Sequence, residues 1–203
     1  DAISDLPEIS VENFKKENNL NEKEIIALLP GSREQEVEKM LSLMLSVRDY
    51  FKNYQFVIAG APSLPKEFYQ KFVDDDVHFV SNKTYDLLRC SKAALVTSGT
   101  ATLETALLNV PEIVCYRTST ISYEIGKRVV KNIKFISLVN LIMDREIVKE
   151  LIQKELNTEN LVNELQKILE GQKRDKMLKN YELLREKLGG KGASEHAAEI
   201  IVN

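Results

Sequence analysis

The 203-residue sequence has no tryptophan, only two cysteines and only two histidines. His78 and His196 lie far apart and show no metal-ligand spacing, so the sequence predicts no metal site. Cys90 and Cys115 both lie in apolar stretches, so we expect buried thiols in a reducing compartment, and a disulfide is the less favoured alternative. Aromatic residues make up 7% of the chain, which argues against a stacking surface for single-stranded nucleic acid.

The sequence also lacks an excess of positive charge and a long apolar run. Its formal net charge is −3, which argues against a general nucleic-acid binder. No apolar run approaches the ~20 residues that cross a bilayer, and no signal peptide is visible. With 43% hydrophobic and 29% charged residues, the composition is typical of a soluble globular protein.

The apolar pattern predicts alternating strands and helices. Nearly continuous apolar runs are typical of parallel strands covered on both faces, and they predict strands at residues 24–29, 55–59, 77–80, 93–96, 112–116 and 135–137. Residues between these runs favour helices at 11–16, 33–47, 65–72, 84–90, 101–108 and 119–130. We therefore predict an α/β fold with a parallel, doubly wound sheet and right-handed crossovers.

The last third of the sequence is different, because from Asp144 onward the pattern predicts helices alone. These are expected at residues 145–153, 158–170, 175–187 and 194–202, after a loop at 138–141. We accordingly expect a lead-in from a preceding domain at residues 1–20, an α/β domain at 21–153 and a C-terminal helical tail at 154–203.

Two clusters of charged residues are interpreted as structural features and not as binding sites. Lys127, Arg128 and Lys131 end the predicted helix at 119–130, and their charge either compensates the helix C-terminus, which we favour, or faces anionic lipid. The three consecutive aspartates at 74–76 are expected to form a solvated turn, because no calcium-binding loop follows them.

Two strand–turn–helix units carry the strongest functional signal. One contains Pro30-Gly31-Ser32-Arg33 and the other contains Ser98-Gly99-Thr100. A helix N-terminus and unpaired backbone amides at the carboxyl edge of a sheet favour a phosphate. The run from Ser32 to Gln35 also has the form of a capping box, which predicts Ser32 as the helix N-cap.

The side chains near these turns extend the prediction to a nucleotide diphosphate. A guanidinium and two helix starts suit the phosphates, and a carboxylate and an amide suit ribose or sugar hydroxyls. The missing Gly-x-Gly-x-x-Gly and Walker motifs weigh against a dehydrogenase and an ATPase, and an ordinary βα turn is the alternative for the central stretch alone. The residues predicted to bind the ligand are Gly31, Ser32, Arg33, Ser98, Gly99, Thr100, Glu104 and Asn140.

The same segments resemble the lipid-A-disaccharide synthase family. The resemblance rests on Leu28-Leu29-Pro30-Gly31-Ser32-Arg33, on Ser98 to Glu104, on Tyr116-Arg117, on Lys127 to Lys131 and on Ser137 to Leu141. These segments follow the family order from about residue 25 to 151, and a weaker match lies at residues 192–195. Val139 stands where the family usually has proline, which is expected to loosen the loop that holds Asn140.

This resemblance implies the Rossmann-like C-terminal half of a glycosyltransferase B-type fold. It implies that the half binds a UDP-sugar and serves the inverting transfer of 2,3-diacylglucosamine from UDP to 2,3-diacylglucosamine 1-phosphate, without a cofactor. Arg33 and the helix start at 98–100 would stabilise the leaving diphosphate, Glu104 would hold ribose hydroxyls, and Asn140 would orient the donor.

The resemblance also implies parts that this sequence lacks. The acceptor site and the catalytic base would lie in an N-terminal domain, so no catalytic residue and no transfer by this chain alone are expected. The whole protein would be peripheral on the cytoplasmic face of the bacterial inner membrane and would bind no nucleic acid. The alternatives are another UDP-sugar transferase or epimerase, or a non-catalytic nucleotide-binding module whose helices contact a partner.

Overall fold

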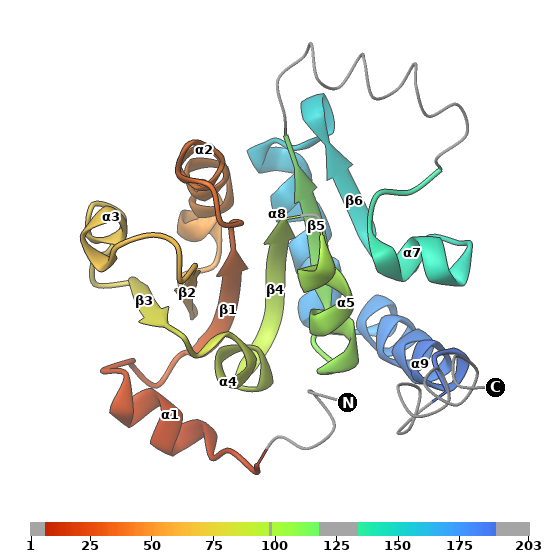
Figure 1. Cartoon of the computed structure of the whole chain (residues 1–203), viewed down its shortest axis with the longest axis horizontal. Coiled ribbons are helices and arrows are strands. Elements are labelled where there is room, and N and C mark those ends of the chain that lie inside the picture. The colour runs from red at the N-terminus through yellow and green to blue at the C-terminus, as the bar shows by residue number, and fades with distance from the viewer. Residues whose placement is uncertain (1–6, 98, 118–133, 190–203) are drawn as a thin grey trace, which may run out of the picture.

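The computed structural model describes residues 7–97, 99–117 and 134–189. Within them, six parallel strands form one sheet in the order β3-β2-β1-β4-β5-β6 (Figure 1). The strands are β1 (Glu24–Leu29), β2 (Tyr54–Gly60), β3 (Val77–Ser81), β4 (Ser91–Thr97), β5 (Glu112–Tyr116) and β6 (Lys149–Ile152). The chain builds one half of the sheet outward from β1 and then builds the other half from β4. The predicted doubly wound α/β fold is therefore confirmed.

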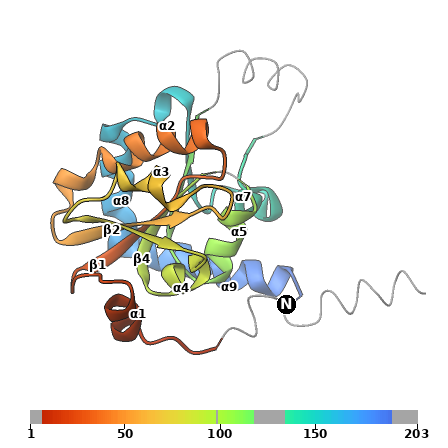
Figure 2. The same ribbon diagram turned by 60° about the vertical axis from the view of Figure 1, so that its left-hand side comes forward.

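Helices connect the strands and cover the sheet. They are α1 (Val11–Glu17), α2 (Glu34–Leu45), α3 (Lys66–Gln70), α4 (Thr84–Arg89), α5 (Thr100–Leu107), α7 (Leu138–Met143), α8 (Thr158–Leu169) and α9 (Gln172–Lys187), with short 3-10 turns at η1 (Arg48–Tyr50) and η2 (Gln153–Glu155). Figure 2 shows α2 and α3 on one side of the sheet and α1 and α4 on the other.

Successive residues of β1 show why this strand is apolar throughout. Ile26 and Leu28 lie in a core shared with α2, α8 and α9, whereas Ile25, Ala27 and Leu29 lie in a second core shared with α1 and α4. Side chains alternate between the two faces of a strand, and here both faces are covered. The strand therefore carries no polar face, and its loops rather than its side chains are available for a ligand.

The C-terminal helices belong to the same core as the strands. Leu161 and Leu165 of α8, with Met177 and Tyr181 of α9, are buried in the core on the α2 side of the sheet. Their apolar spacing at three and four residues gives each helix one inward face. The predicted helices at 158–170 and 175–187 are confirmed, and the helices predicted at 119–130 and 194–202 lie outside the described residues.

Three expectations near residue 145 are wrong. The strand expected at 135–137 is absent from the described structure, residues 138–141 lie in helix α7 rather than in a loop, and β6 replaces the helix expected at 145–153. Ile147, Val148 and Leu151 have a spacing that fits a helix. Parallel pairing of β6 with β5 and burial of Leu151 overrule that pattern.

Both cysteines are buried, unpaired thiols, as the sequence predicts. Cys90 and Cys115 lie in different cores, so they cannot form a disulfide with each other. Burial raises the pKa of Cys90 to about 11 and raises that of Cys115 as well. Both side chains are therefore protonated at neutral pH and serve as packing groups.

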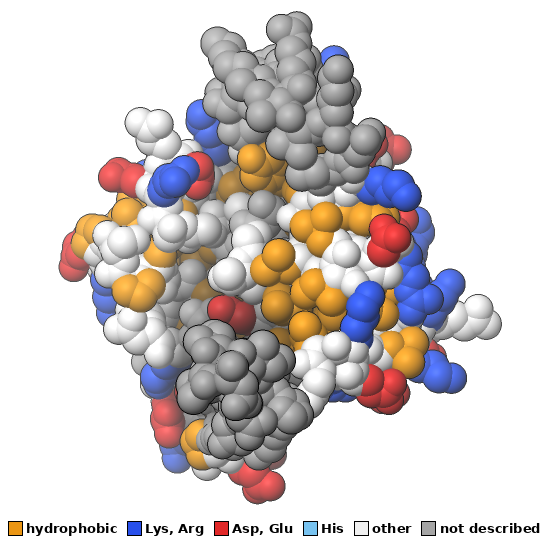
Figure 3. All heavy atoms as spheres, turned by 45° about the vertical axis from the view of Figure 1, so that its right-hand side comes forward, with side chains coloured by type: hydrophobic (Ala, Val, Ile, Leu, Met, Phe, Trp, Pro, Cys, Tyr) orange, Lys and Arg blue, Asp and Glu red, His pale blue; other side chains and the backbone are white. Residues whose placement is uncertain are grey.

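Helix α5 is supported by apolar packing on the side away from the sheet centre. It contacts α7 and α9, and Figure 3 shows hydrophobic side chains gathered on this face of the molecule. Leu141 of α7 is 43% exposed, and Leu103 of α5 is partly buried against the core. No helix among the described residues is long and apolar enough to cross a membrane.

Glu112, the first residue of β5, is a buried carboxyl group. None of the described residues hydrogen-bonds its two oxygens, and burial raises its pKa well above the usual value. Because the folded-state pKa is the higher one, the folded chain keeps a proton that the unfolded chain releases. The stability associated with this group is complete below the unfolded-state pKa and is lost as pH rises toward the folded-state pKa.

We expect Glu112→Gln to remove this pH dependence. In the parent chain, this one group should lower the free energy of unfolding by about 1.4 kcal/mol per pH unit across that interval. Urea unfolding measured from about pH 5 to 8 tests this, with the exposed Glu182→Gln as the control. Identical pH profiles for the parent chain and Glu112→Gln would contradict the prediction.

Candidate functional site

The predicted site lies at the carboxyl edge of the two central strands. β1 and β4 are hydrogen-bonded neighbours, and Leu29 at the end of β1 is in register with Val96. A Cβ added to Gly31 would lie 3.9 Å from Cγ2 of Thr97, so the loop after β1 lies against the end of β4. The strand order reverses between these strands, and open α/β sheets bind ligands at such a switch point.

Two glycines shape the turns that meet there. Gly31 has φ +100° and Gly99 has φ +136°, conformations that other residues rarely adopt. Gly99 is the N-cap of α5, and a Cβ added to it would meet no atom within 4 Å. The amide of Thr102 donates to the Gly99 carbonyl at 3.3 Å, and the two amides before it, at the start of α5, have no acceptor within the helix. Backbone donors and open space thus occur together, whereas Ser98 lies outside the described residues.

Helix α2 begins one residue later than the sequence predicts. Its N-cap is Arg33, whose carbonyl accepts from the amides of Glu36 and Val37. The expectation that Ser32 is the N-cap is wrong, because the turn at Gly31 leaves Ser32 before the helix. The carbonyl of Ser32 instead accepts a hydrogen bond from the hydroxyl of Ser63 at 3.0 Å.

Arg33 presents a guanidinium at this edge. Its side chain is 81% exposed and forms an ion pair with Glu36 at 3.2 Å, one helical turn away. An exposed pair of this kind contributes little to stability, so its geometry is easily exchanged for a ligand contact. Arg33 is therefore well placed to contact an anion at the start of α2.

Glu104 borders a cavity between α4 and α5. The cavity has a volume of 490 Å³ and is lined by Asn82, Lys83, Thr84, Tyr85, Asp86 and Glu104. Burial and the neighbouring Glu104 carboxylate raise the pKa of the Tyr85 hydroxyl. Tyr85 is not among the residues predicted from the sequence, although its position shortly after a parallel strand is a signal for the carboxyl edge.

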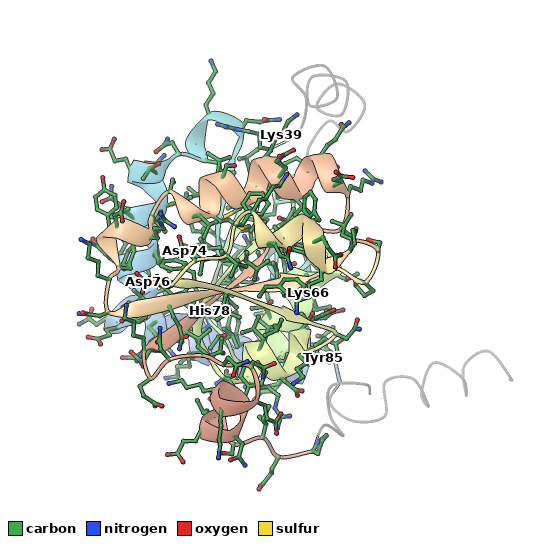
Figure 4. All side chains as sticks on the ribbon, turned by 90° about the vertical axis from the view of Figure 1, so that its left-hand side faces the viewer. Lys39, Lys66, Asp74, Asp76, His78 and Tyr85 are labelled. Carbon is green, nitrogen blue, oxygen red and sulfur yellow. The ribbon has the colours of Figure 1, made fainter. Side chains whose placement is uncertain are left out.

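Figure 4 shows how these groups are distributed along the strands. Tyr85 and Lys66 lie toward one end of β2 and β3, and Asp74 and Asp76 lie toward the other. Asp74 accepts hydrogen bonds from the amides of Asp76 and Val77, which closes the polar turn that the sequence predicts. The aspartates therefore belong to the amino edge and not to the candidate site.

Asn140 is not brought to the surface of this edge. It is fully buried at the third position of α7, where Nδ2 donates to the Val148 carbonyl at 2.8 Å and to Glu150 Oε1 at 2.9 Å. Its Oδ1 accepts from the amides of Ile147 at 2.7 Å and Val148 at 3.0 Å. All its bonding groups are thus used within the fold, and this geometry does not support the expected direct contact with a donor.

The segment around Asn140 is a packed helix rather than a loosened loop. Ser137 is the N-cap of α7 and accepts a hydrogen bond from the amide of Asn140. Val139, at the position where a proline was expected, is fully buried in the core. Valine at this position therefore leaves the segment ordered.

The fold is that of a glycosyltransferase B-type domain. The structure of S. aureus MnaA with UDP aligns with a TM-score of 0.60 at 15% identity, over 96% of this chain and 48% of that one. The calicheamicin glycosyltransferase CalG4 aligns with a TM-score of 0.58 at 14% identity, over 89% of this chain and 42% of that one. These likenesses define the class of fold.

Sequence comparison identifies the family within this class. The model of the family described as lipid-A-disaccharide synthetase matches residues 3–202. The lipid-A-disaccharide synthase of Syntrophus aciditrophicus is 39% identical over 182 residues, which cover 85% of this chain and 47% of that protein. The chain belongs to the lipid-A-disaccharide synthetase family. It spans about half the length of the curated relatives it matches.

Proposed function

We propose that this chain binds a UDP-sugar donor at the carboxyl edge of β1 and β4. One observation carries the proposal: two glycine turns, each followed by a helix start, meet at the switch point, and one of them bears the exposed Arg33. Backbone amides, positive helix ends and a guanidinium together suit a diphosphate. Glu104, beside this arrangement, suits the ribose hydroxyls.

In the proposed reaction, 2,3-diacylglucosamine passes from UDP to 2,3-diacylglucosamine 1-phosphate. The acceptor hydroxyl attacks the anomeric carbon from the side opposite UDP, the bond from that carbon to the diphosphate oxygen breaks, and the configuration inverts. Negative charge then grows on the leaving diphosphate, where Arg33 and the start of α5 stabilise it. Ser32, Ser98 and Thr100 are proposed to add hydroxyl or amide donors at the same place.

We propose that the acceptor site and the base lie outside these 203 residues, in the rest of the whole protein. An N-terminal domain would supply the acceptor site and the base that takes the proton of the attacking hydroxyl. Both sugars carry acyl chains, so the proposal includes work at the cytoplasmic surface of the bacterial inner membrane. Within this chain, Asn140 would act indirectly, by holding α7 and β6 together behind α5.

We expect UDP to raise the melting temperature of the 203-residue chain more than ADP does. A ligand that binds only the folded state at one hundred times its Kd adds about 2.7 kcal/mol, which corresponds to roughly 5–10 °C for a domain of this size. Differential scanning fluorimetry with UDP, ADP, uridine and pyrophosphate measures this. Equal shifts with UDP, ADP and pyrophosphate would indicate a general phosphate site instead of a uridine nucleotide site.

Turnover separates the proposed transfer from other reactions of UDP-sugars. A UDP-sugar epimerase or another transferase would share the diphosphate site and the response to UDP. The proposed whole protein, which includes the N-terminal domain, should release UDP from the acylated donor only when the acylated acceptor is also present. Conversion of the donor alone would favour an epimerase.

A further inference from the structure

We propose that Tyr85 is a positioning residue of the donor site: its hydroxyl donates a hydrogen bond to the Glu104 carboxylate and turns that carboxylate toward the ribose. This inference rests on the proposed function, because the ribose enters only with a nucleotide donor. It adds a residue that acts through Glu104 and does not itself need to touch the nucleotide.

The placement of the two residues follows from the topology. Tyr85 is the second residue of α4, which follows β3, and Glu104 is the fifth residue of α5, which follows β4. Both helices therefore begin at the carboxyl edge of the sheet. Their side chains line one cavity of 490 Å³, although they are 19 positions apart in the sequence.

The electrostatics of the cavity match a phenol that donates to a carboxylate. Burial contributes most to the raised pKa of Tyr85, and the charge and hydrogen bonding of Glu104 raise it further. A hydroxyl that donates to an anion keeps its proton more firmly, which is the direction seen. Tyr85 is thus a stable neutral donor throughout the neutral pH range.

The cation that lines the same cavity is engaged elsewhere. The ammonium of Lys83 contacts Glu17 at 3.6 Å and donates to Asn18 at 3.1 Å, both at the end of α1. Among the described residues, no ion pair involves Glu104. The Tyr85 hydroxyl is therefore the described group best placed to fix the carboxylate.

The two oxygens of the Glu104 carboxylate have different proposed partners, and this predicts how much UDP affinity is lost without Tyr85. One oxygen accepts from Tyr85, and the other remains free to accept from the 2′- and 3′-hydroxyls of ribose. Without Tyr85, the Glu104 side chain must be immobilised when the nucleotide binds. Ordering one such side chain weakens binding by about 2- to 12-fold.

Calorimetric titration of the 203-residue chain with UDP and with 2′,3′-dideoxyuridine diphosphate tests the inference. We expect Tyr85→Phe to weaken UDP binding by about 2- to 12-fold and to leave the dideoxy analogue unchanged, because that analogue has no ribose hydroxyls for Glu104. Tyr50→Phe, at a tyrosine that is 64% exposed outside the cavity, should change neither value. In a Glu104→Gln background, Tyr85→Phe should have little further effect on UDP.

A spectroscopic readout follows the hydrogen bond itself. In NMR titrations of tyrosine labelled at Cζ, the pKa of Tyr85 should fall in Glu104→Gln, because the neighbouring anion is removed. A Tyr85 pKa that does not change in this variant overturns the inference.

The binding outcomes separate this inference from the proposed function. Equal weakening of both ligands by Tyr85→Phe would show a packing role and overturn it, and so would an unchanged UDP affinity. If Arg33→Ala weakens UDP binding while Tyr85→Phe does not, the donor site stands and only the positioning role fails. If the parent chain does not bind UDP, both fail.

Discussion

Arg33→Ala is expected to weaken UDP binding by about 10- to 150-fold. A charge-assisted hydrogen bond contributes roughly 1.5–3 kcal/mol, and each 1.4 kcal/mol is about tenfold in affinity. The guanidinium is exposed at the start of α2, and its ion pair with Glu36 is a surface contact that a diphosphate can displace. Arg33→Lys should recover only part of the affinity, because an ammonium cannot form the forked contact.

Calorimetric titration with UDP and with uridine measures this effect. Uridine has no phosphate, so it should bind the parent chain and Arg33→Ala alike. Arg48→Ala is a matched control, since Arg48 is a partly exposed arginine paired with Asp74 at the opposite edge of the sheet. Circular dichroism checks the fold of each variant. An unchanged UDP affinity in folded Arg33→Ala would show that Arg33 is not part of the site. The turn before α5 would then be the remaining candidate for binding the diphosphate.

Asn140→Ala should produce the largest loss of stability, about 3–5 kcal/mol. The amides of Ile147 and Val148, the carbonyl of Val148 and the carboxylate of Glu150 would each lose a buried partner. A buried polar group left without a partner costs about 1–3 kcal/mol, and losses above about 4 kcal/mol are exceptional for one substitution. Breaking this network should detach β6 from α7.

Urea unfolding of Asn140→Ala, with the exposed Asn53→Ala as the control, tests the structural role. The control should lie within about 0.5 kcal/mol of the parent chain. A loss below 1 kcal/mol in Asn140→Ala would be incompatible with the observed network. UDP titration of the variant under conditions where it is folded addresses the earlier expectation: a large loss of affinity there would restore a direct contact with the donor.

The strands at the centre of the sheet and the two glycine turns could be predicted from the sequence alone, because each depends on a short local pattern of residues. The apolar runs at residues 24–29 and 112–116 gave strands with the observed bounds, since a strand buried on both faces is apolar along its length, here after a glutamate at the first position of each. The turns containing Gly31 and Gly99 were equally visible, because their positive φ angles favour glycine. Family motifs at the same positions then predicted the family.

What the sequence did not reveal depends on contacts between distant segments. Ile147, Val148 and Leu151 fit a helix or a strand equally well, and parallel pairing with β5 places Leu151 in strand β6, which begins just after Val148. The sequence predicted a free amide at Asn140, because its partners, Val148 just before β6 and Glu150 within β6, approach it only in the folded chain.

Tyr85 and Glu104 became neighbours for the same reason. Nothing in the separate sequences of α4 and α5 specifies their distance, whereas the order of β3 and β4 in the sheet fixes where both helices begin. The sequence by itself determined the two glycine turns and the helix that follows each of them, since these are local patterns, and the proposed diphosphate site depends on them. Only the tertiary structure decided which polar side chains stay exposed, as Arg33 does, and which hold the fold, as Asn140 does, because burial and hydrogen-bond partners arise from long-range packing.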